Sequence, residues 1–234
     1  MNLHFLQTTY HLSKTELQIL DYLDQQSYRL KEVSVRQTAK DCFTSPTSII
    51  RLAKKLNLSG YNELWYKIKE AHLPAPTITE VLPQPEEIKH FCQLMRVNQG
   101  HLITVLGHDF SAHLSAYMNE VLNFHCIPSV TTAHPQMINS RNNQNFLLIV
   151  VSHSGEEPTL KDTVALAKRR KHTIIAFLGT KQAQLAATAD LVFSTNSYSP
   201  FSTHIAQPQL FFGRTLVTFE TLICAYINSQ QENK

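Results

Sequence analysis

The chain has 234 residues, of which 43% are hydrophobic and 17% are charged, and its formal net charge at pH 7 is +3. This balance is typical of a protein that buries a core. The longest apolar run, residues 146–151, is far shorter than the ~20 residues that a membrane-spanning helix needs. The N-terminal stretch has no basic segment followed by an apolar one, so we expect neither a signal peptide nor a membrane protein.

Cysteine and histidine spacing gives no sign of a metal site. The four cysteines, Cys42, Cys92, Cys126 and Cys224, lie far apart in the sequence. Neither a CxxC nor an HExxH spacing occurs among them and the twelve histidines. We therefore expect no metal, no cofactor, and reduced thiols in the core of a cytoplasmic protein.

The charge is unevenly distributed. Residues 1–72 contain ten Lys and Arg against seven Asp and Glu, whereas residues 73–234 contain eleven of each. Within residues 36–69 the count is seven basic against two acidic. Local basicity of this kind suggests a polyanionic partner for the N-terminal part, although a solvated helical face would give the same count.

The first third of the chain has the pattern of a helical bundle. Ser13 and Glu16 form a capping-box signature at the start of a first helix. A second helix is expected at residues 34–42, and Ser45 followed by Pro46 marks the start of a third. The apolar positions of the third helix recur with helical spacing: Ile49, Leu52, Ala53 and Leu56.

Two helices joined by a tight turn indicate a helix-turn-helix, although a plain three-helix bundle has the same periodicity. The start of a recognition helix enters the major groove, where hydroxyls and arginine reach base edges and lysines contact phosphates. We expect base contacts from Thr47, Ser48 and Arg51, and phosphate contacts from Lys54 and Lys55. The full predicted DNA-binding set is Ser45, Thr47, Ser48, Arg51, Lys54 and Lys55. Phe43, in the turn, must avoid a left-handed backbone or accept strain.

Residues 38–64, TAKDCFTSPTSIIRLAKKLNLSGYNEL, resemble the helix-turn-helix of RpiR-type bacterial transcriptional regulators. The positions that match the pattern of that family are Ala39, Ser45, Arg51, Lys55, Leu56, Gly60, Tyr61, Glu63 and Leu64. The departures are Ser48, Ile49, Leu52 and Asn57. Asn57 replaces a helix-terminating glycine, which is a mild change because asparagine also tolerates a left-handed C-cap.

Four prolines between His72 and Pro85 predict a domain boundary, because proline cannot continue a helix. We expect a helix-turn-helix domain at residues 1–72, a linker at 73–85 and a second domain at 86–234. There, helical segments alternate with short β-branched strands, which indicates an α/β doubly wound five-stranded parallel sheet. The expected strands are 101–107, 127–131, 146–152, 173–178 and 191–194, with helices at 111–124, 159–171 and 214–228.

This second half resembles the sugar-isomerase (SIS) domain, which RpiR-type regulators carry as their phosphosugar sensor. The matching residues are Gly107 and Ser111 in a G-x-G-x-S turn, SHSGE at 152–156, and A-x-x-A-D at 186–190. The order of the two domains is also that of the family. The resemblance implies that Ser111, Ser152 and Ser154 hold the phosphate of a phosphosugar.

The residues themselves also suggest an anion site, since hydroxyls and amides around Gly155 precede a helix that begins near Pro158. Simple capping of that helix is the alternative. The expected effector-binding residues are Ser111, Ser152, His153, Ser154, Gly155, Glu157 and Thr159.

Two acidic substitutions oppose a phosphate. Glu157 stands at the last hydroxyl of the family pattern S-x-S-G-x-T, and Asp109 at the second glycine of G-x-G-x-S. At ~4 Å and an effective dielectric of ~20, one such repulsion costs about 4 kcal/mol, which offsets roughly two charge-assisted hydrogen bonds. Pro158 favours Glu157 at the N-cap, where its carboxylate would satisfy the helix amides. We therefore expect a retuned pocket for a less charged sugar, an amino sugar, or a weakly bound phosphosugar.

The expected function is that of a cytoplasmic transcriptional regulator of sugar or amino-sugar metabolism, and not an enzyme. It would bind double-stranded operator DNA as a homodimer or homotetramer and sense a sugar phosphate or related effector. One alternative is a SIS-type phosphosugar isomerase or lyase, with proton-transfer candidates His108, His134, His153 and Glu120. The other is a DNA-binding regulator whose SIS domain serves only dimerisation.

Overall fold

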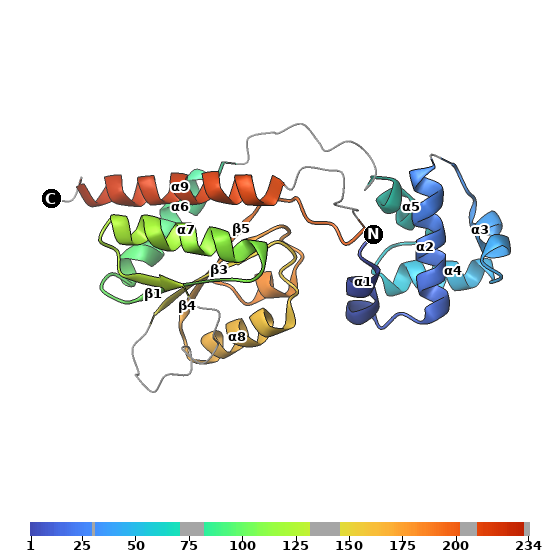
Figure 1. The fold of residues 1–234 in the computed structure, drawn as a ribbon, viewed down its shortest axis with the longest axis horizontal. Coiled ribbons are helices and arrows are strands. Elements are labelled where there is room, and N and C mark those ends of the chain that lie inside the picture. Colours follow the sequence, from blue (N-terminus) through green and yellow to red (C-terminus); the bar gives the residue numbers. More distant parts are fainter. Residues whose placement is uncertain (30, 71–81, 132–145, 202–209, 232–234) are drawn as a thin grey trace. The chain divides into compact units, whose positions relative to one another are not determined.

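The computed structural model describes residues 1–29, 31–70, 82–131, 146–201 and 210–231 (Figure 1). The chain divides into two compact units. One comprises Met1–Thr77 with Ser199–Pro208, and the other Ile78–Tyr198 with Gln209–Lys234. Most of the predicted linker, residues 73–81, lies outside the described residues, and Pro85 at its end already begins a helix.

The N-terminal unit is built from helices. They are α1 (Leu3–Tyr10), α2 (Lys14–Tyr28), α3 (Val35–Asp41), α4 (Pro46–Lys55) and α5 (Tyr61–Glu70). The predicted capping box is confirmed, because the amide of Ser13 donates to the Glu16 carboxylate at 2.7 Å and Ser13 Oγ accepts from the Glu16 amide at 3.3 Å. Ser45 is the N-cap of α4, as expected, and α3 begins at the expected place with Ser34 as its N-cap.

The core of this unit lies between α2, α4 and α5. Its fully buried side chains include Leu20, Leu23, Ile49, Leu52, Leu64 and Ile68. Phe201 also belongs to this core and is 6% exposed. Because Ile49, Leu52 and Ala53 are all buried, the position of α4 is fixed by packing, and its opposite side faces solvent.

The C-terminal unit is a five-stranded sheet in which every neighbouring pair is parallel, so the predicted fold class is confirmed. The strands are β1 (Ile103–Gly107), β2 (Ser129–Thr131), β3 (Leu147–Ser152), β4 (Thr173–Leu178) and β5 (Leu191–Ser194). Their order is β2-β1-β3-β4-β5. All residues of β1 and β3 are buried, as expected for strands covered on both faces.

Helices cover both faces of the sheet (Figure 1). One face carries α6 (Pro85–Val97), α7 (Phe110–Phe124) and α9 (Leu210–Gln231), and the other carries α8 (Pro158–Arg169) and the short 3-10 helix η2 (Gln184–Ala187). By length and composition, α9 is the one helix of the described residues that could cross a membrane. Its buried side chains, including Phe211, Phe219 and Leu222, lie in the core above the sheet. The packing of these side chains in the core explains the apolar composition of α9.

The expectation that the cysteines are core thiols is wrong for two of them. Cys92 is buried and Cys42 is half-buried, but Cys126 and Cys224 are exposed, and all four are free thiols. Within the described ranges, no group of three or more His, Cys, Asp or Glu side chains could hold a metal ion.

Candidate functional site

Helix α4, which the sequence predicts to be a recognition helix, begins with a hydroxyl cap. Ser45 Oγ accepts from the amide of Ser48 at 3.1 Å, and the hydroxyls of the two serines lie 2.8 Å apart. Both residues are exposed. Ser45 therefore fixes the start of the helix at the end where base contacts are expected.

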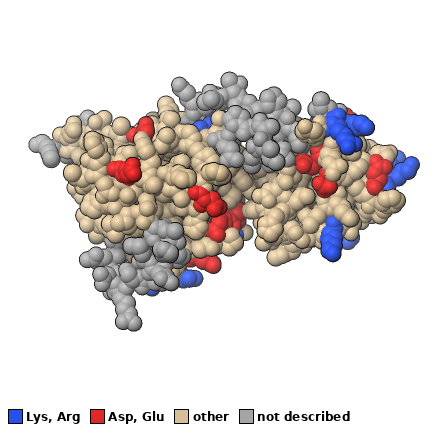
Figure 2. Space-filling model, viewed as in Figure 1, with Lys and Arg blue, Asp and Glu red and all other residues tan. Residues whose placement is uncertain are grey.

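The two lysines at the end of α4 have different surroundings. Lys54, like Arg51 and Thr47, is exposed, and neither Lys54 nor Arg51 forms an ion pair with another described residue. Lys55, in contrast, donates from Nζ to Glu16 Oε2 at 2.9 Å and to the carbonyl of His11 at 3.0 Å. In Figure 2 the Lys and Arg side chains in view lie mainly on the N-terminal unit. Arg51 and Lys54 are thus the basic residues of α4 that are available to a polyanion.

The backbone at Phe43, in the turn before α4, is left-handed and therefore strained, which is one of the two alternatives that the sequence allows. Phe43 has a φ of 51° and its side chain is 98% exposed. A left-handed conformation costs a non-glycine residue roughly 1–2 kcal/mol. Asn57, just after α4, also has a positive φ of 61°, which confirms its predicted left-handed position.

In the C-terminal unit, the strand order places the topological switch point, where a crevice is expected, between the tips of β1 and β3. The chain leaves β1 for α7 on one face and leaves β3 for α8 on the other, so the two loops diverge at this point. Ligands of doubly wound sheets bind outside the carboxyl ends of the strands at such a switch point. The structure brings His108 of the first loop to Glu157 of the second, with 3.8 Å between Nδ1 and Oε2.

Two of the predicted serines, Ser152 and Ser154, accept hydrogen bonds from amides of their own loop after β3. Ser152 Oγ accepts from the amide of Gly155 at 3.0 Å, and Ser154 Oγ accepts from the amide of Glu156 at 3.3 Å. Gly155 has a φ of 67°, and a Cβ there would lie 2.5 Å from the Cβ of Ala183. Glycine is therefore required at this position for both backbone and packing reasons.

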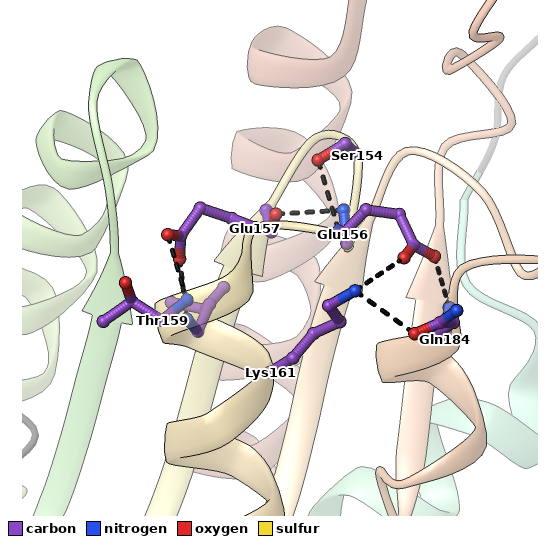
Figure 3. A network of polar contacts seen from close by, with 9 residues as sticks. Ser154, Glu156, Glu157, Thr159, Lys161 and Gln184 are labelled. Carbon is purple, nitrogen blue, oxygen red and sulfur yellow. Dashed lines mark hydrogen bonds and ion pairs between the residues drawn. The ribbon is translucent and has the colours of Figure 1, made fainter. Parts of the chain in front are cut away.

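The two glutamates that follow bind amides of the protein itself (Figure 3). Glu157 is the N-cap of α8 and accepts from the amides of Thr159 at 3.1 Å and Leu160 at 2.6 Å, which confirms its predicted capping role. Glu156 accepts from the amide of Gln184 at 2.6 Å and from Lys161 Nζ at 3.2 Å. The partner of Glu156 was not predicted, because Gln184 lies 28 residues away in the sequence.

The loop after β1 is strained at Asp109. This residue has φ 50° and ψ −127°, a region that glycine favours, and its side chain makes no capping hydrogen bond. Ser111, in the first turn of α7, is 6% exposed, and its carbonyl accepts from Ser115 Oγ at 3.0 Å. A Cβ on Gly107 would lie 2.4 Å from Ser115 Oγ, so this glycine lets α7 approach β1 closely.

The remaining candidates are dispersed. The ring of His153 stacks on Phe211 at 4.9 Å between centroids and lies edge-on to Tyr198 at 5.2 Å, so it packs among aromatics of the α9 face. Thr159 is exposed in the first turn of α8. Glu120 lies ten residues into α7, about 15 Å along the helix from the crevice. His134 lies outside the described residues. Of the proton-transfer candidates within the described ranges, His108 is the one that faces Glu157.

Comparison with protein families identifies both units. Residues 2–73 match the helix-turn-helix domain of the rpiR family, and residues 105–219 match the SIS domain. The chain belongs to the RpiR family. The helix-turn-helix domain precedes the SIS domain in this chain, as the sequence predicted.

Solved structures share the fold of this RpiR-family chain. The Vibrio vulnificus NanR protein, complexed with ManNAc-6P, aligns with a TM-score of 0.57 and 16% identity, over 99% of this chain and 93% of NanR. The c3406 protein of E. coli CFT073 aligns with a TM-score of 0.54 and 18% identity, over 80% of this chain and 94% of that protein. A sequence search of curated proteins found no match.

Proposed function

We propose that this RpiR-family chain is a cytoplasmic transcriptional regulator that binds operator DNA through α4 and senses a sugar-related effector at the β1/β3 crevice. The observation that carries the proposal is the exposed side of α4, where Thr47, Arg51 and Lys54 face solvent opposite a fully buried face. A helix fixed in this way presents its side chains in a defined register, as base readout requires.

On DNA, the start of α4 would enter the major groove. Thr47, Ser48 and Arg51 would contact base edges, since hydroxyls and guanidinium groups suit the donor and acceptor pattern of that groove. Lys54 would contact a backbone phosphate. Lys55 would contribute a phosphate contact only by giving up its bonds to Glu16 and His11, and Ser45 would act through its cap.

The effector site would lie at the tips of β1 and β3, with Ser111 on one side and Ser152, Ser154 and Glu157 on the other. Support for a sugar derivative comes from the fold neighbours, one of which was solved with ManNAc-6P. To regulate, the effector must bind one arrangement of the DNA-binding heads more tightly than another, because equal affinity shifts nothing. The assembly is proposed to be a homodimer or homotetramer.

DNA-protection sequencing of genomic fragments with a metabolite panel tests this proposal. The purified protein is expected to protect a small number of defined sites, and a sugar of the panel is expected to change that protection. A protein that protects no site above the level of random fragments would contradict the regulator function. Defined sites that no sugar alters would instead support a SIS domain that serves only assembly.

One observation favours the enzyme alternative: the 3.8 Å approach of His108 to Glu157, two groups able to transfer protons in the crevice. An isomerase would convert a sugar phosphate with a pH-dependent rate that His108→Ala abolishes. The exposed basic side of α4 has no role in such an enzyme, which is why the regulator is preferred.

A further inference from the structure

We infer that the carboxylate of Glu157 takes the place of a ligand phosphate at the N-terminus of α8, so that the β1/β3 crevice selects sugars without a phosphate group. The inference rests on the proposed function, because it names the class of effector that the same site accepts. In a receptor that binds a phosphate at this place, the first amides of the helix would instead be free to bind the anion.

The first argument is a complete accounting of the amides that begin α8. A helix N-terminus binds anions because its first amides lack partners within the helix. Here Pro158 has no N–H, and the amides of Thr159 and Leu160 donate to the Glu157 carboxylate at 3.1 and 2.6 Å. The amide of Lys161 donates to the carbonyl of Glu157 at 3.0 Å. A phosphate would therefore have to displace Glu157 before it met an unbonded amide in the first turn of α8.

The second argument concerns the loop that leads into α8. Its amides at Gly155 and Glu156 donate to the hydroxyls of Ser152 and Ser154. Its cation, Lys161, lies 3.2 Å from Glu156 and 3.2 Å from Gln184 Oε1 (Figure 3). Two amides of the loop and the nearby lysine are thus bonded within the protein without any ligand.

The third argument is charge. The two loops that flank the crevice, residues 108–111 and 152–161, contain three carboxylates, Asp109, Glu156 and Glu157, and one lysine, Lys161. That lysine is already paired with Glu156. A phosphate would enter next to Asp109 and Glu157, which have no Lys or Arg partner among the described residues, although His108 lies 3.8 Å from Glu157. Coulomb repulsion from the two carboxylates opposes the phosphate.

The same groups suit a sugar that lacks a phosphate. Carboxylate oxygens retain lone pairs beyond those used by two amides, so Glu157 can accept from sugar hydroxyls. An ammonium group on an amino sugar would be attracted by the charge that repels phosphate. Sugars without a phosphate group are either neutral sugars or amino sugars, and their affinities in a binding experiment distinguish the two.

The test compares matched ligand pairs by isothermal titration calorimetry on the full-length protein. The pairs are N-acetylmannosamine with its 6-phosphate, and glucosamine with its 6-phosphate; inorganic phosphate is the minimal probe. The wild type is expected to bind the unphosphorylated member of at least one pair ten times or more tightly than its phosphate. Stronger binding of glucosamine than of N-acetylmannosamine would mark an amino-sugar site.

Variants of Glu157 test whether this residue causes the selection against phosphate. Glu157→Thr keeps an N-cap oxygen but removes the carboxylate, and Glu157→Gln keeps the length of the side chain. Both are expected to gain tenfold or more in affinity for inorganic phosphate and for the phosphorylated sugars. Asp162→Asn removes one negative charge from an exposed position on the same helix and is the matched control, expected to match the wild type.

Three outcomes would overturn the inference: a wild type that prefers the phosphorylated sugars, variants that gain no phosphate affinity, or a wild type that binds no sugar of either kind. None of these affects operator protection by the wild-type protein, which tests the DNA-binding function independently. Circular dichroism of each variant establishes that an unchanged affinity comes from a folded protein.

Discussion

Lys55 and Glu16 join the end of α4 to the start of α2, with 2.9 Å between Nζ and Oε2. The carbonyl of His11, 3.0 Å from the same Nζ, completes the connection. The neighbouring Lys54 is exposed and has no ion-pair partner among the residues that the structure describes. Two consecutive lysines therefore have different surroundings: Lys55 links α4 to α2, and Lys54 is the one that we propose contacts DNA.

Replacing each lysine by alanine should separate these roles. Each phosphate contact adds about 0.9 to the slope of log affinity against log salt. Lys54→Ala is expected to lower that slope by about 1, whereas Lys55→Ala is expected to leave it nearly unchanged and to lower the unfolding free energy by about 0.5–1 kcal/mol. Operator binding at several salt concentrations and urea unfolding measure the two effects. Equal losses of slope in both variants would assign Lys55 to DNA as well.

We expect Glu16 to make the free energy of unfolding depend on pH in the acid range. Burial acts to raise the pKa of this carboxyl, but hydrogen bonds from Lys55 and Ser13 outweigh it, and the pKa lies below its ordinary value of 4.5. A carboxyl with a lowered pKa stabilises the fold above the ordinary value, and this contribution is lost as the pH falls through the lowered pKa. Wild-type protein should therefore lose unfolding free energy more steeply than Glu16→Gln as the pH drops below 4.5.

Urea unfolding at a series of pH values measures that slope. Asp21→Asn, which removes an exposed carboxylate from the same helix, is the matched control. A control that flattens the pH dependence as much as Glu16→Gln would show that general charge repulsion, and not the bond to Lys55, sets the acid sensitivity.

Features set by local sequence were predictable. Ser13, Ser34 and Ser45 mark helix starts because a cap depends on the next three residues, and Pro158 fixes Glu157 at the N-cap for the same reason. The strands β4 and β5 have the bounds that were predicted from their short apolar runs.

Features that depend on distant segments were not predictable. Lys55 bonds to Glu16, which lies 39 residues away in the sequence, and no local pattern around Lys55 indicates this partner. Glu156 finds the amide of Gln184 only because η2 packs beside α8. Cys126 and Cys224 were expected to be core thiols, but both are exposed. Cys126 lies in the turn after α7, with a φ of 58°, and for Cys224 tertiary packing decides which side of the largely apolar α9 meets the sheet.

The strained turn predicts a stabilising substitution. Phe43 has a φ of 51° and buries almost none of its side chain, so glycine loses little there and relieves the left-handed backbone. Phe43→Gly is expected to raise the unfolding free energy by about 1 kcal/mol. Asn57→Gly, at a φ of 61°, is the control and should gain less because asparagine tolerates this conformation. A variant at Phe43 that is less stable than the wild type would reveal contacts of the ring.

We expect Arg51 to contribute to discrimination between operator and random DNA. Its exposed side chain lies on α4 nearly two turns after the Ser45 cap and forms no ion pair with a described residue, so its guanidinium is available for bidentate contact with a base edge. Arg51→Ala is expected to reduce discrimination between operator and random DNA by about 1–3 kcal/mol, with a smaller effect on binding to random DNA. Competition binding assays with both DNAs measure the ratio. Arg29→Ala removes the same charge from an exposed position at the end of α2 and should leave that ratio unchanged. If discrimination survives in Arg51→Ala, the assignment of α4 as the reading helix is wrong.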